Sequence, residues 1–348
     1  MKIFDGHNDC LLRLFLSGHA DPASLFFNAP SSGHIDFPRI QRGGFCGGFF
    51  AIYVPADPTK QSGSLMPNSN HTPLPAPLDA DYARRVTLSM ASILLQIVER
   101  SNDEIRLVTS KTALDEAITQ NRLAVVFHVE GVEAIDADLA MLDVLYAAGL
   151  RSLGPVWSRP NIFAHGVPFR YPSSPDIGDG LTEAGKRLIK ACNRKRILVD
   201  LSHLNEKGFW DVAAISDAPL VATHSNAHAL CQQSRNLTDK QLDCIRERQG
   251  MVGVNFATAF LREDGQRRAD TPLHDILRHL DYLITRLGED KVGFGSDFDG
   301  ALIPEAIQDV AGLPNLVTAM RAHGYGEELI EKICWRNWVD VIGRTIGD

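Results

Sequence analysis

The sequence lacks a long apolar run and an obvious leader segment. It contains no stretch of about 18 apolar residues, the length that a membrane span requires. Residues 1–4 lead directly into the polar positions Asp5, His7 and Asp9, whereas a signal peptide would continue with an apolar stretch. We therefore expect no membrane association and a cytoplasmic location.

Paired cysteines and excess positive charge are also missing. The cysteines at positions 10, 46, 192, 231, 244 and 334 form no Cys-x-x-Cys pair, which predicts reduced thiols in a chain of 348 residues. Lys and Arg total 35 against 43 Asp and Glu, so the formal net charge is −8. Because a general nucleic-acid binder normally presents a basic face, we expect no nucleic-acid partner.

The sequence does contain short apolar runs with helical patterns between most of them. Helical spacing is clear at 82–101, and 138–148 and 182–194 also fill gaps between runs. Thr238 and Gln241 form a capping box, and Thr271-Pro272 predicts an N-cap followed by proline at the first position of a helix to about residue 287. The apolar runs, typical of parallel strands covered by helices, span 2–6, 47–54, 123–129, 151–156, 197–201, 219–223, 251–256 and 292–295.

Strand-then-helix repetition without an obvious edge strand predicts a closed (β/α)8 barrel of the TIM type, not an open doubly wound sheet. The chain exceeds the usual ~250 residues of this fold by roughly 100. We place the excess in loops over the C-terminal mouth, at 56–81 and 158–180, and in extra helices after Gly300. No linker is evident, so residues 1–348 are expected to form one domain.

Imidazoles and carboxylates follow most of the predicted strands, where the active sites of this barrel lie. His7 and Asp9 are two residues apart after the first strand, so both can point into the mouth and bind Zn²⁺. Glu130 follows the third strand and could bridge two metal ions. His203 and His224 follow consecutive strands and are strong zinc ligands when neutral. Each residue alone has an ordinary structural explanation, but together they predict a metal site.

Other polar residues near these strand ends each allow more than one interpretation. Asp297, after the last strand, could hold a proton in a hydrolysis, and Arg235 could pair with a substrate carboxylate or lie on the surface. His128 is either an outer support of the metal site or barrel interior, and we favour the interior. Asp200 could orient an imidazole or cap the next helix. For Asp299 we favour a turn with Gly300.

These residues, in this order, resemble the membrane (renal) dipeptidase family of zinc peptidases, peptidase family M19, among the amidohydrolase-like barrels. The resemblance covers nearly the whole chain, and its motifs are specific in combination. The matching stretches are 5–9, 33–39, 50–55, 129–131, 199–203, 223–227, 234–236 and 292–300.

The resemblance implies two Zn²⁺ ions per chain. His7 and Asp9 would bind the first ion, and His203 and His224 would bind the second. Glu130 and a hydroxide would bridge the two, and the hydroxide would attack the scissile carbonyl carbon. The family also suggests a homodimer, and the absence of a leader and an anchor tail indicates a bacterial-type soluble member.

The resemblance further implies that Asp297 transfers a proton from the water to the leaving amine, and that Arg235 holds the C-terminal carboxylate of a dipeptide. Family members commonly accept a D-amino acid at that C-terminal position. The sequence departs from the family at Trp157, which stands where a substrate-contacting His is usual, and at Val132, where a second Gly is usual. His165 could substitute for that His or be a surface loop residue.

Three hypotheses of function follow. The first is a binuclear zinc dipeptidase that cleaves small dipeptides such as L-Ala–D-Ala, with the two long loops excluding longer peptides. The alternative is an N-acyl amino acid amidohydrolase on the same site, with Trp157 changing the substrate. The third, a catalytically silent barrel that binds a metal or a peptide, is disfavoured because every expected ligand and Asp297 are present.

Overall fold

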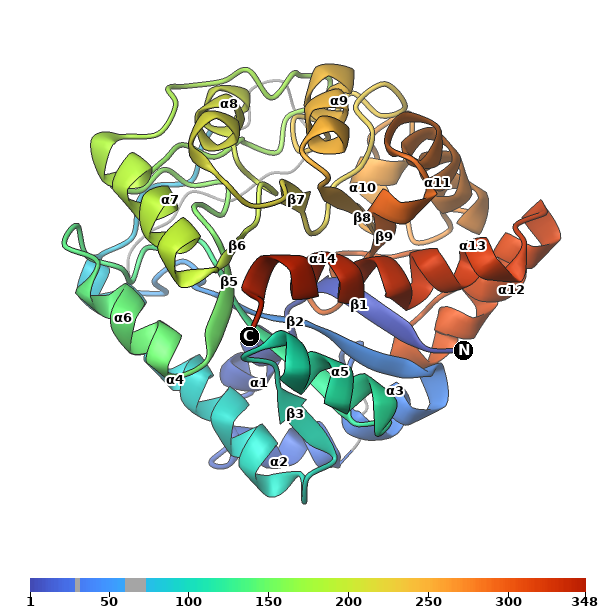
Figure 1. Cartoon of the computed structure of the whole chain (residues 1–348), viewed down its shortest axis with the longest axis horizontal. Coiled ribbons are helices and arrows are strands. Elements are labelled where there is room, and N and C mark those ends of the chain that lie inside the picture. The colour runs from blue at the N-terminus through green and yellow to red at the C-terminus, as the bar shows by residue number, and fades with distance from the viewer. Residues whose placement is uncertain (29–31, 60–72) are drawn as a thin grey trace.

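The computed structural model describes residues 1–28, 32–59 and 73–348, and its centre is a nearly closed barrel of parallel strands (Figure 1). Hydrogen bonds run along the order β6-β5-β4-β2-β1-β9-β8-β7, and an isolated parallel bridge between Asp200 and Val221 joins the two ends. The predicted TIM-like (β/α)8 fold is confirmed. The strands are β1 (Ile3–Asn8), β2 (Phe45–Tyr53), β4 (Leu123–Glu130), β5 (Leu150–Gly154), β6 (Leu198–Val199), β7 (Val221–Ala222), β8 (Met251–Asn255) and β9 (Val292–Gly295).

A ninth strand, β3 (Ile105–Leu107), was not predicted. It pairs in parallel with the first residues of β4, where β2 already occupies the other edge. β5 pairs with β4 only from Phe127 onward, so β3 satisfies the backbone groups that β5 leaves free. Three residues are too few to produce a recognisable hydrophobic pattern.

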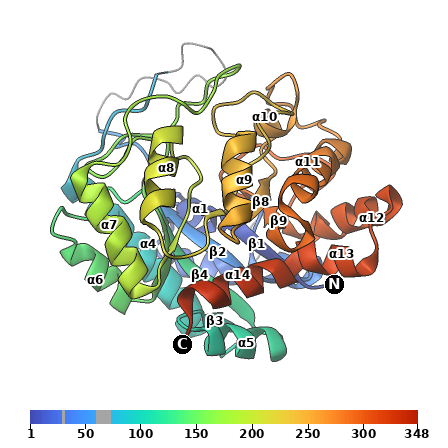
Figure 2. The same ribbon diagram turned by 45° about the horizontal axis from the view of Figure 1, so that its top comes forward.

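Helices surround the barrel (Figures 1 and 2). None of the helices in the described part of the chain is long and apolar enough to cross a membrane. The segment after Gly300 adds helices, as predicted. The helices are α1 (Cys10–Leu16), α2 (Pro22–Phe27), α3 (Phe37–Gly43), α4 (Ala80–Arg100), α5 (Lys111–Thr119), α6 (Ala140–Ala147), α7 (Glu183–Lys195), α8 (Glu206–Ile215), α9 (Asp239–Glu247), α10 (Thr258–Leu261), α11 (Leu273–Leu287), α12 (Leu313–His323), α13 (Glu327–Glu331) and α14 (Asn337–Ile346), with short helical turns η1 (Glu289–Lys291), η2 (Val310–Gly312) and η3 (Lys332–Arg336).

The two helix starts predicted from capping signals had different outcomes. The capping box is present at α9, where Gln241 Oε1 accepts a hydrogen bond from the Thr238 backbone N–H at 2.9 Å. The cap of α11 was predicted one residue too early, because Pro272 is the N-cap and Leu273 the first helical residue. The Thr271 hydroxyl donates instead to the Arg268 carbonyl oxygen at 2.6 Å.

The two predicted mouth loops are only partly described. Of the loop at 56–81, residues 60–72 lie outside the described residues, and 56–59 and 73–79 contain no helix or strand. The loop at 158–180 is described throughout and has one isolated bridge, between Gly166 and Leu204.

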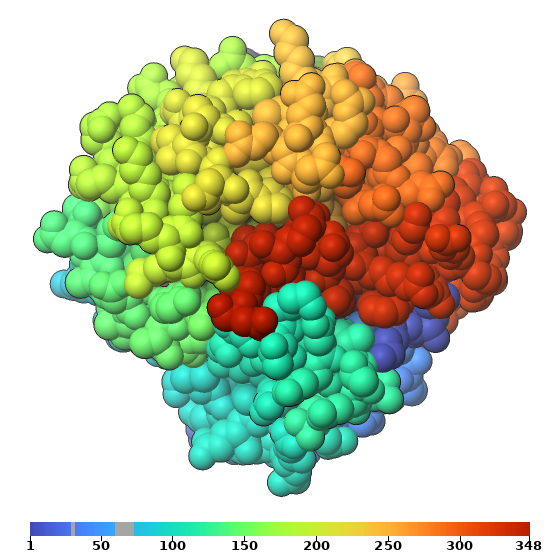
Figure 3. Space-filling model, in the orientation of Figure 1, coloured from blue at the N-terminus to red at the C-terminus, as the bar shows by residue number. Residues whose placement is uncertain are grey.

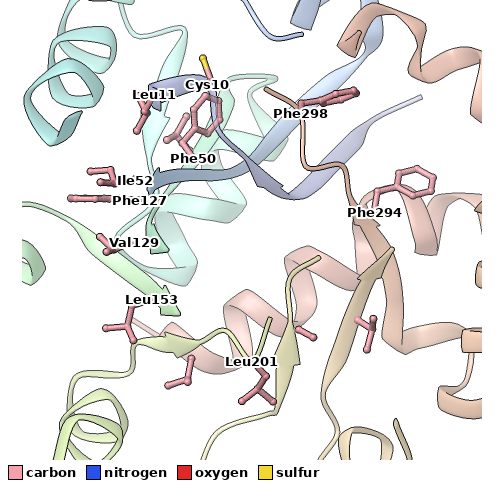
Figure 4. Close-up of a cluster of buried hydrophobic side chains, with 14 of the residues drawn as sticks. Cys10, Leu11, Phe50, Ile52, Phe127, Val129, Leu153, Leu201, Phe294 and Phe298 are labelled. Atoms are coloured by element: carbon pink, nitrogen blue, oxygen red, sulfur yellow. The ribbon is translucent and has the colours of Figure 1, made fainter. Parts of the chain in front are cut away.

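The main hydrophobic core lies between the barrel and the helices. Alternate strand residues such as Phe50, Phe127 and Phe294 are buried in it, together with the inner faces of the helices (Figure 4). Along β4 the intervening residues include His128 and Glu130, which are buried outside this cluster. Strand alternation therefore sends the polar residues of β4 into the barrel.

The amino-terminal end of the barrel is closed by Trp338, a fully buried residue of α14. Figures 1 and 3 show α14 lying across the centre of this face, beside α5. The indole N–H donates to the Phe294 carbonyl oxygen at 2.9 Å. The strands make room with glycine, since a Cβ atom on Gly6, Gly253 or Gly293 would lie 2.5, 2.9 or 2.6 Å from the indole.

We expect Trp338→Ala to lower the free energy of unfolding by about 3–5 kcal/mol, the usual cost of emptying a large aromatic site in a core. Urea unfolding followed by circular dichroism measures the change. Trp210→Ala is the matched control, because Trp210 is 37% exposed and its loss should cost about 1 kcal/mol or less. Equal losses in the two variants would contradict the sealing role of Trp338.

Candidate active site and metal centre

The polar residues predicted at the strand ends meet at the carboxyl end of the barrel. His7 lies inside β1 rather than after it, because β1 extends to Asn8. The pairing of β1 with β2 shifts register between Asp5 and Asn8. Such an irregularity re-aims side chains. It lets Gly6 face Trp338 while His7 Nε2 lies 3.5 Å from Asp9 Oδ2 and 3.5 Å from Glu130 Oε1.

Glu130, the last residue of β4, is the centre of the cluster. Its Oε1 atom lies 3.0 Å from His203 Nε2 and 3.3 Å from His224 Nε2. The two Nε2 atoms of His203 and His224 are 3.1 Å apart, and the rings of His7 and His224 are stacked at 3.8 Å. The structure thus brings all five predicted ligands together, from four different strand ends. The five residues define what we call the donor cluster.

Unpaired buried atoms show that the donor cluster suits a metal ion. Both ring nitrogens of His7 and the Oδ1 atom of Asp9 are buried without a hydrogen-bond partner among the described residues. The Nε2 atoms of His203 and His224 and the Oε1 atom of Glu130 also converge. There is little room between them for the hydrogen atoms that would give each of the three a hydrogen bond. Nitrogen and carboxylate donors that converge in this way fit a divalent metal ion.

Burial and charge set the proton affinities in the cluster. Burial lowers the pKa of His203 and of His224 well below its usual value, because the protonated ring loses its hydration. Burial likewise raises the pKa of Glu130 well above its usual value. For His7, burial opposes protonation, but surrounding carboxylates led by Glu130 raise its pKa to about 10. The cluster therefore attracts positive charge, and metal binding would release a proton.

Outer hydrogen bonds orient two of the imidazoles. Thr223 Oγ1 lies 2.8 Å from His224 Nδ1 and donates to Asp200 Oδ2 at 2.6 Å. Ser158 Oγ lies 2.8 Å from His203 Nδ1. Holding Nδ1 in this way directs Nε2 toward the cluster. Of the two roles considered for Asp200, the structure thus favours orientation, through Thr223.

His128 occupies the barrel interior, as we favoured. It is fully buried beneath the donor cluster, with its Nδ1 atom 2.8 Å from Ser152 Oγ. Its ring lies edge-on to His7 at 5.6 Å, and its Nε2 atom is 3.7 Å from Asp200 Oδ2. Asp299 also has a structural role, since it accepts hydrogen bonds from Arg13 Nε at 3.0 Å and from the His34 backbone N–H at 2.5 Å.

Asp297 lies beside the donor cluster and lines a cavity. Its backbone is in the left-handed region with φ of 59°, and its N–H donates to the His7 carbonyl oxygen at 3.0 Å. Asn255 Nδ2 donates to Asp297 Oδ2 at 2.9 Å. A Cβ atom on Gly300 would come within 2.5 Å of Asp297 Oδ1, so only glycine leaves that oxygen room. Asn255, the last residue of β8, was not predicted, because it carries no titratable group that would mark it.

The cavity has a volume of about 300 Å³, with donor-cluster residues in its lining. Trp157, for which we predict contact with the substrate, lines the cavity beside Tyr53 at 4.7 Å and Phe169 at 5.6 Å between ring centroids. Phe169 belongs to the loop at 158–180, which therefore does contribute to the mouth. His165 is not part of the lining formed by the described residues.

Arg159 supports this aromatic wall and was not predicted. Its guanidinium lies over the Trp157 ring at 4.6 Å and donates to the Tyr53 hydroxyl at 3.0 Å. It also lies 3.4 Å from Glu133 Oε1, and both charged side chains are almost fully buried. A single Arg after a strand carries no signal that could have revealed this partnership.

Arg235 is buried beside the cluster but is not among the described residues that line the cavity. Its Nη2 atom donates to the His224 carbonyl oxygen at 3.1 Å, and its Nε atom has no partner in the described part of the chain. Its guanidinium lies 5.5 Å from the ring of Phe260, which does line the cavity. Burial lowers the pKa of Arg235 to about 10, a value at which it is still charged near neutrality.

Comparisons with known proteins agree with this architecture. Residues 1–346 match the family model described as membrane dipeptidase (peptidase family M19). A metallopeptidase structure from Rhodobacter sphaeroides, liganded with a phosphinate mimic of the dipeptide L-Ala-D-Ala, is 51% identical with a TM-score of 0.92, covering 99% of each chain. A structure of dipeptidase AC, a metallopeptidase of family M19, is 52% identical with a TM-score of 0.92, covering 100% of this chain and 99% of that one. An uncharacterized Klebsiella pneumoniae protein is 51% identical over 72% of this chain and 93% of its own length. The chain therefore belongs to the membrane dipeptidase family, peptidase family M19, and is a metallodipeptidase.

Proposed function

We propose that the protein hydrolyses small dipeptides, including L-Ala–D-Ala, with two zinc ions held by the donor cluster. The observation that carries the proposal is the convergence of His7, His203 and His224 on one oxygen of Glu130, within 3.0–3.5 Å. Asp9 would complete the first ion's site, as expected from its position near His7. When bound, the two zinc ions would lower the pKa of a water molecule and polarise the scissile carbonyl group.

Asp297 is the proposed acid and base. It would accept the proton of the attacking water and deliver it to the nitrogen of the leaving amino acid. Asn255 holds the Oδ2 atom at 2.9 Å, which leaves Oδ1 as the oxygen that can exchange a proton. The cavity exposes Asp297 next to Glu130 and Asp9, where the water and the peptide bond would lie.

The small cavity supports a dipeptide as substrate. A volume of about 300 Å³ accommodates two small residues and leaves little space for a longer peptide. Trp157 and Tyr53 would pack against the substrate, and Arg235 would hold its C-terminal carboxylate. The dipeptide mimic bound by the Rhodobacter sphaeroides relative, which is 51% identical, supports an L–D pair.

The decisive experiment is an assay of the zinc-loaded protein with L-Ala–D-Ala, L-Ala–L-Ala and N-acetyl-D-Ala in parallel. We expect zinc-dependent release of alanine from L-Ala–D-Ala, abolished by a chelator and restored by added zinc. Turnover of the acetylated compound alone would contradict the proposal and identify an N-acyl amino acid hydrolase. Comparable turnover of both alanine dipeptides would retain the dipeptidase and reject the preference for a D-residue.

Arg235→Lys should raise the KM for L-Ala–D-Ala about tenfold, because lysine cannot form the paired hydrogen bonds that a guanidinium makes to a carboxylate. The control is the C-terminal amide of the same dipeptide, which lacks the carboxylate. Its kcat/KM should change little between wild type and variant. An equal loss for acid and amide would show that Arg235 supports the fold of the site through His224, not the substrate.

A further inference from the structure

One cation that lines the active-site cavity has no hydrogen-bond or ion-pair partner in the described part of the chain. Among the described residues that line the cavity, Arg267 is the single Arg or Lys, and it is exposed to solvent. It has no hydrogen bond or ion pair with any residue that the structure describes. Asp297 and three members of the donor cluster, Asp9, Glu130 and His203, line the same cavity.

The arginines near Arg267 in the chain behave differently. Arg262 pairs with Asp264, with Nη2 to Oδ2 at 2.5 Å, and Arg268 pairs with Asp270, also at 2.5 Å. Each therefore has its charge matched by an aspartate two residues later. Position 269, two residues after Arg267, is an alanine. The unmatched charge is thus the one that faces the cavity.

The backbone around Arg267 is anchored, so the guanidinium does not project from a loose segment. The Arg268 N–H donates to Thr258 Oγ1 at 3.2 Å, and Thr258 itself lines the cavity. The Ala269 carbonyl oxygen accepts from the Glu305 N–H at 2.8 Å. The residues on either side of Thr258 in the chain, Ala257, Ala259 and Phe260, give the cavity an apolar wall.

We propose that Arg267 selects dipeptides that carry a second carboxylate, on an acidic side chain. The inference rests on the proposed dipeptidase function and names a substrate class for that site. A main-chain carboxylate would be held by the buried Arg235, while an acidic side chain that extends along the apolar wall would meet Arg267. A guanidinium without a competing intramolecular carboxylate is a ready partner for a carboxylate of the substrate.

The test compares acidic dipeptides with their neutral amide counterparts. We would measure kcat/KM for L-Ala–D-Glu against L-Ala–D-Gln, and for L-Glu–D-Ala against L-Gln–D-Ala, with L-Ala–D-Ala as reference. In the wild type we expect a preference for the acidic member in at least one pair, and Arg267→Ala should reduce that preference by roughly tenfold, the size of one hydrogen bond to a charged group. The wild-type preference should also weaken as salt is added, because Arg267 is exposed.

Arg268→Ala is the matched control, since it removes a neighbouring arginine whose charge Asp270 already matches. It should leave the acid-to-amide ratio unchanged. An absent wild-type preference, a preference that survives Arg267→Ala, or an equal loss on L-Ala–D-Ala would each overturn the inference.

A binding measurement separates this inference from the proposed function. Calorimetry with phosphinate mimics of L-Ala–D-Glu and L-Ala–D-Gln, and of L-Glu–D-Ala and L-Gln–D-Ala, reports the acid-to-amide ratio without turnover. If no dipeptide is cleaved, the proposed function fails, and the effect of Arg267→Ala on this ratio still decides the role of Arg267.

Discussion

Asp297→Asn should lower kcat for L-Ala–D-Ala by about 1,000-fold, within the range that general acid–base catalysis contributes. The asparagine amide can keep the size of the side chain, but it cannot accept a proton from water and return it to the leaving nitrogen. Zinc content should stay at the wild-type level, because the donor cluster keeps its ligands. Steady-state kinetics and elemental analysis of the same preparation give the two readouts.

Asp299→Asn is the matched control for this prediction. Asp299 stands on the same turn and also has a positive φ, of 67°, but its carboxylate is engaged with Arg13 and His34. We expect Asp299→Asn to lower stability while kcat falls by a few-fold at most. If Asp297→Asn retained near wild-type turnover, or if it lost its zinc, Asp297 would not be the proton carrier.

The barrel and the donor cluster could be predicted because both depend on local regularities. Apolar runs separated by helical segments indicate the strands, and active-site residues of a barrel follow the strand ends. This rule alone places Glu130, His203 and His224 at one end of the barrel, although they are far apart in the sequence. His7 was predicted to follow the first strand but lies inside β1, and it still reaches Glu130.

The features that were missed depend on packing between distant segments. Trp338 seals the barrel only because Gly6, Gly253 and Gly293 leave space for it, and no local pattern links these positions. Asn255 and Arg159 carry no recognisable signal in the sequence. Only the fold brings Asn255 to Asp297 and Arg159 to the ring of Trp157. The orientation of His224 by Asp200 through Thr223 likewise required coordinates, although all three residues lie near predicted strand ends.

Glu130→Gln should lower metal affinity more than the loss of any hydrogen bond that supports the donor cluster from outside, because Glu130 contacts every imidazole of the cluster. The variant keeps the shape of the side chain, but it loses the negative charge that attracts cations and replaces an oxygen donor with an amide nitrogen. Loss of an outer hydrogen bond costs metal sites roughly 10–100-fold in affinity, and loss of a shared ligand should exceed that. We expect the variant to bind fewer than two zinc ions per chain and to have no measurable dipeptidase activity.

Thermal unfolding with and without zinc tests whether that loss is a loss of metal sites. A ligand that binds only the folded protein stabilises it, so zinc should raise the Tm of the wild type after treatment with a chelator, and raise that of Glu130→Gln much less. Glu133→Gln is the control, since Glu133 is a buried glutamate three residues later that faces Arg159 at 3.4 Å instead of the imidazoles. It should keep the zinc-dependent rise in Tm. If Glu130→Gln kept that rise as well, the convergence of three histidines on Glu130 would be a hydrogen-bonded feature of the barrel and not a metal centre.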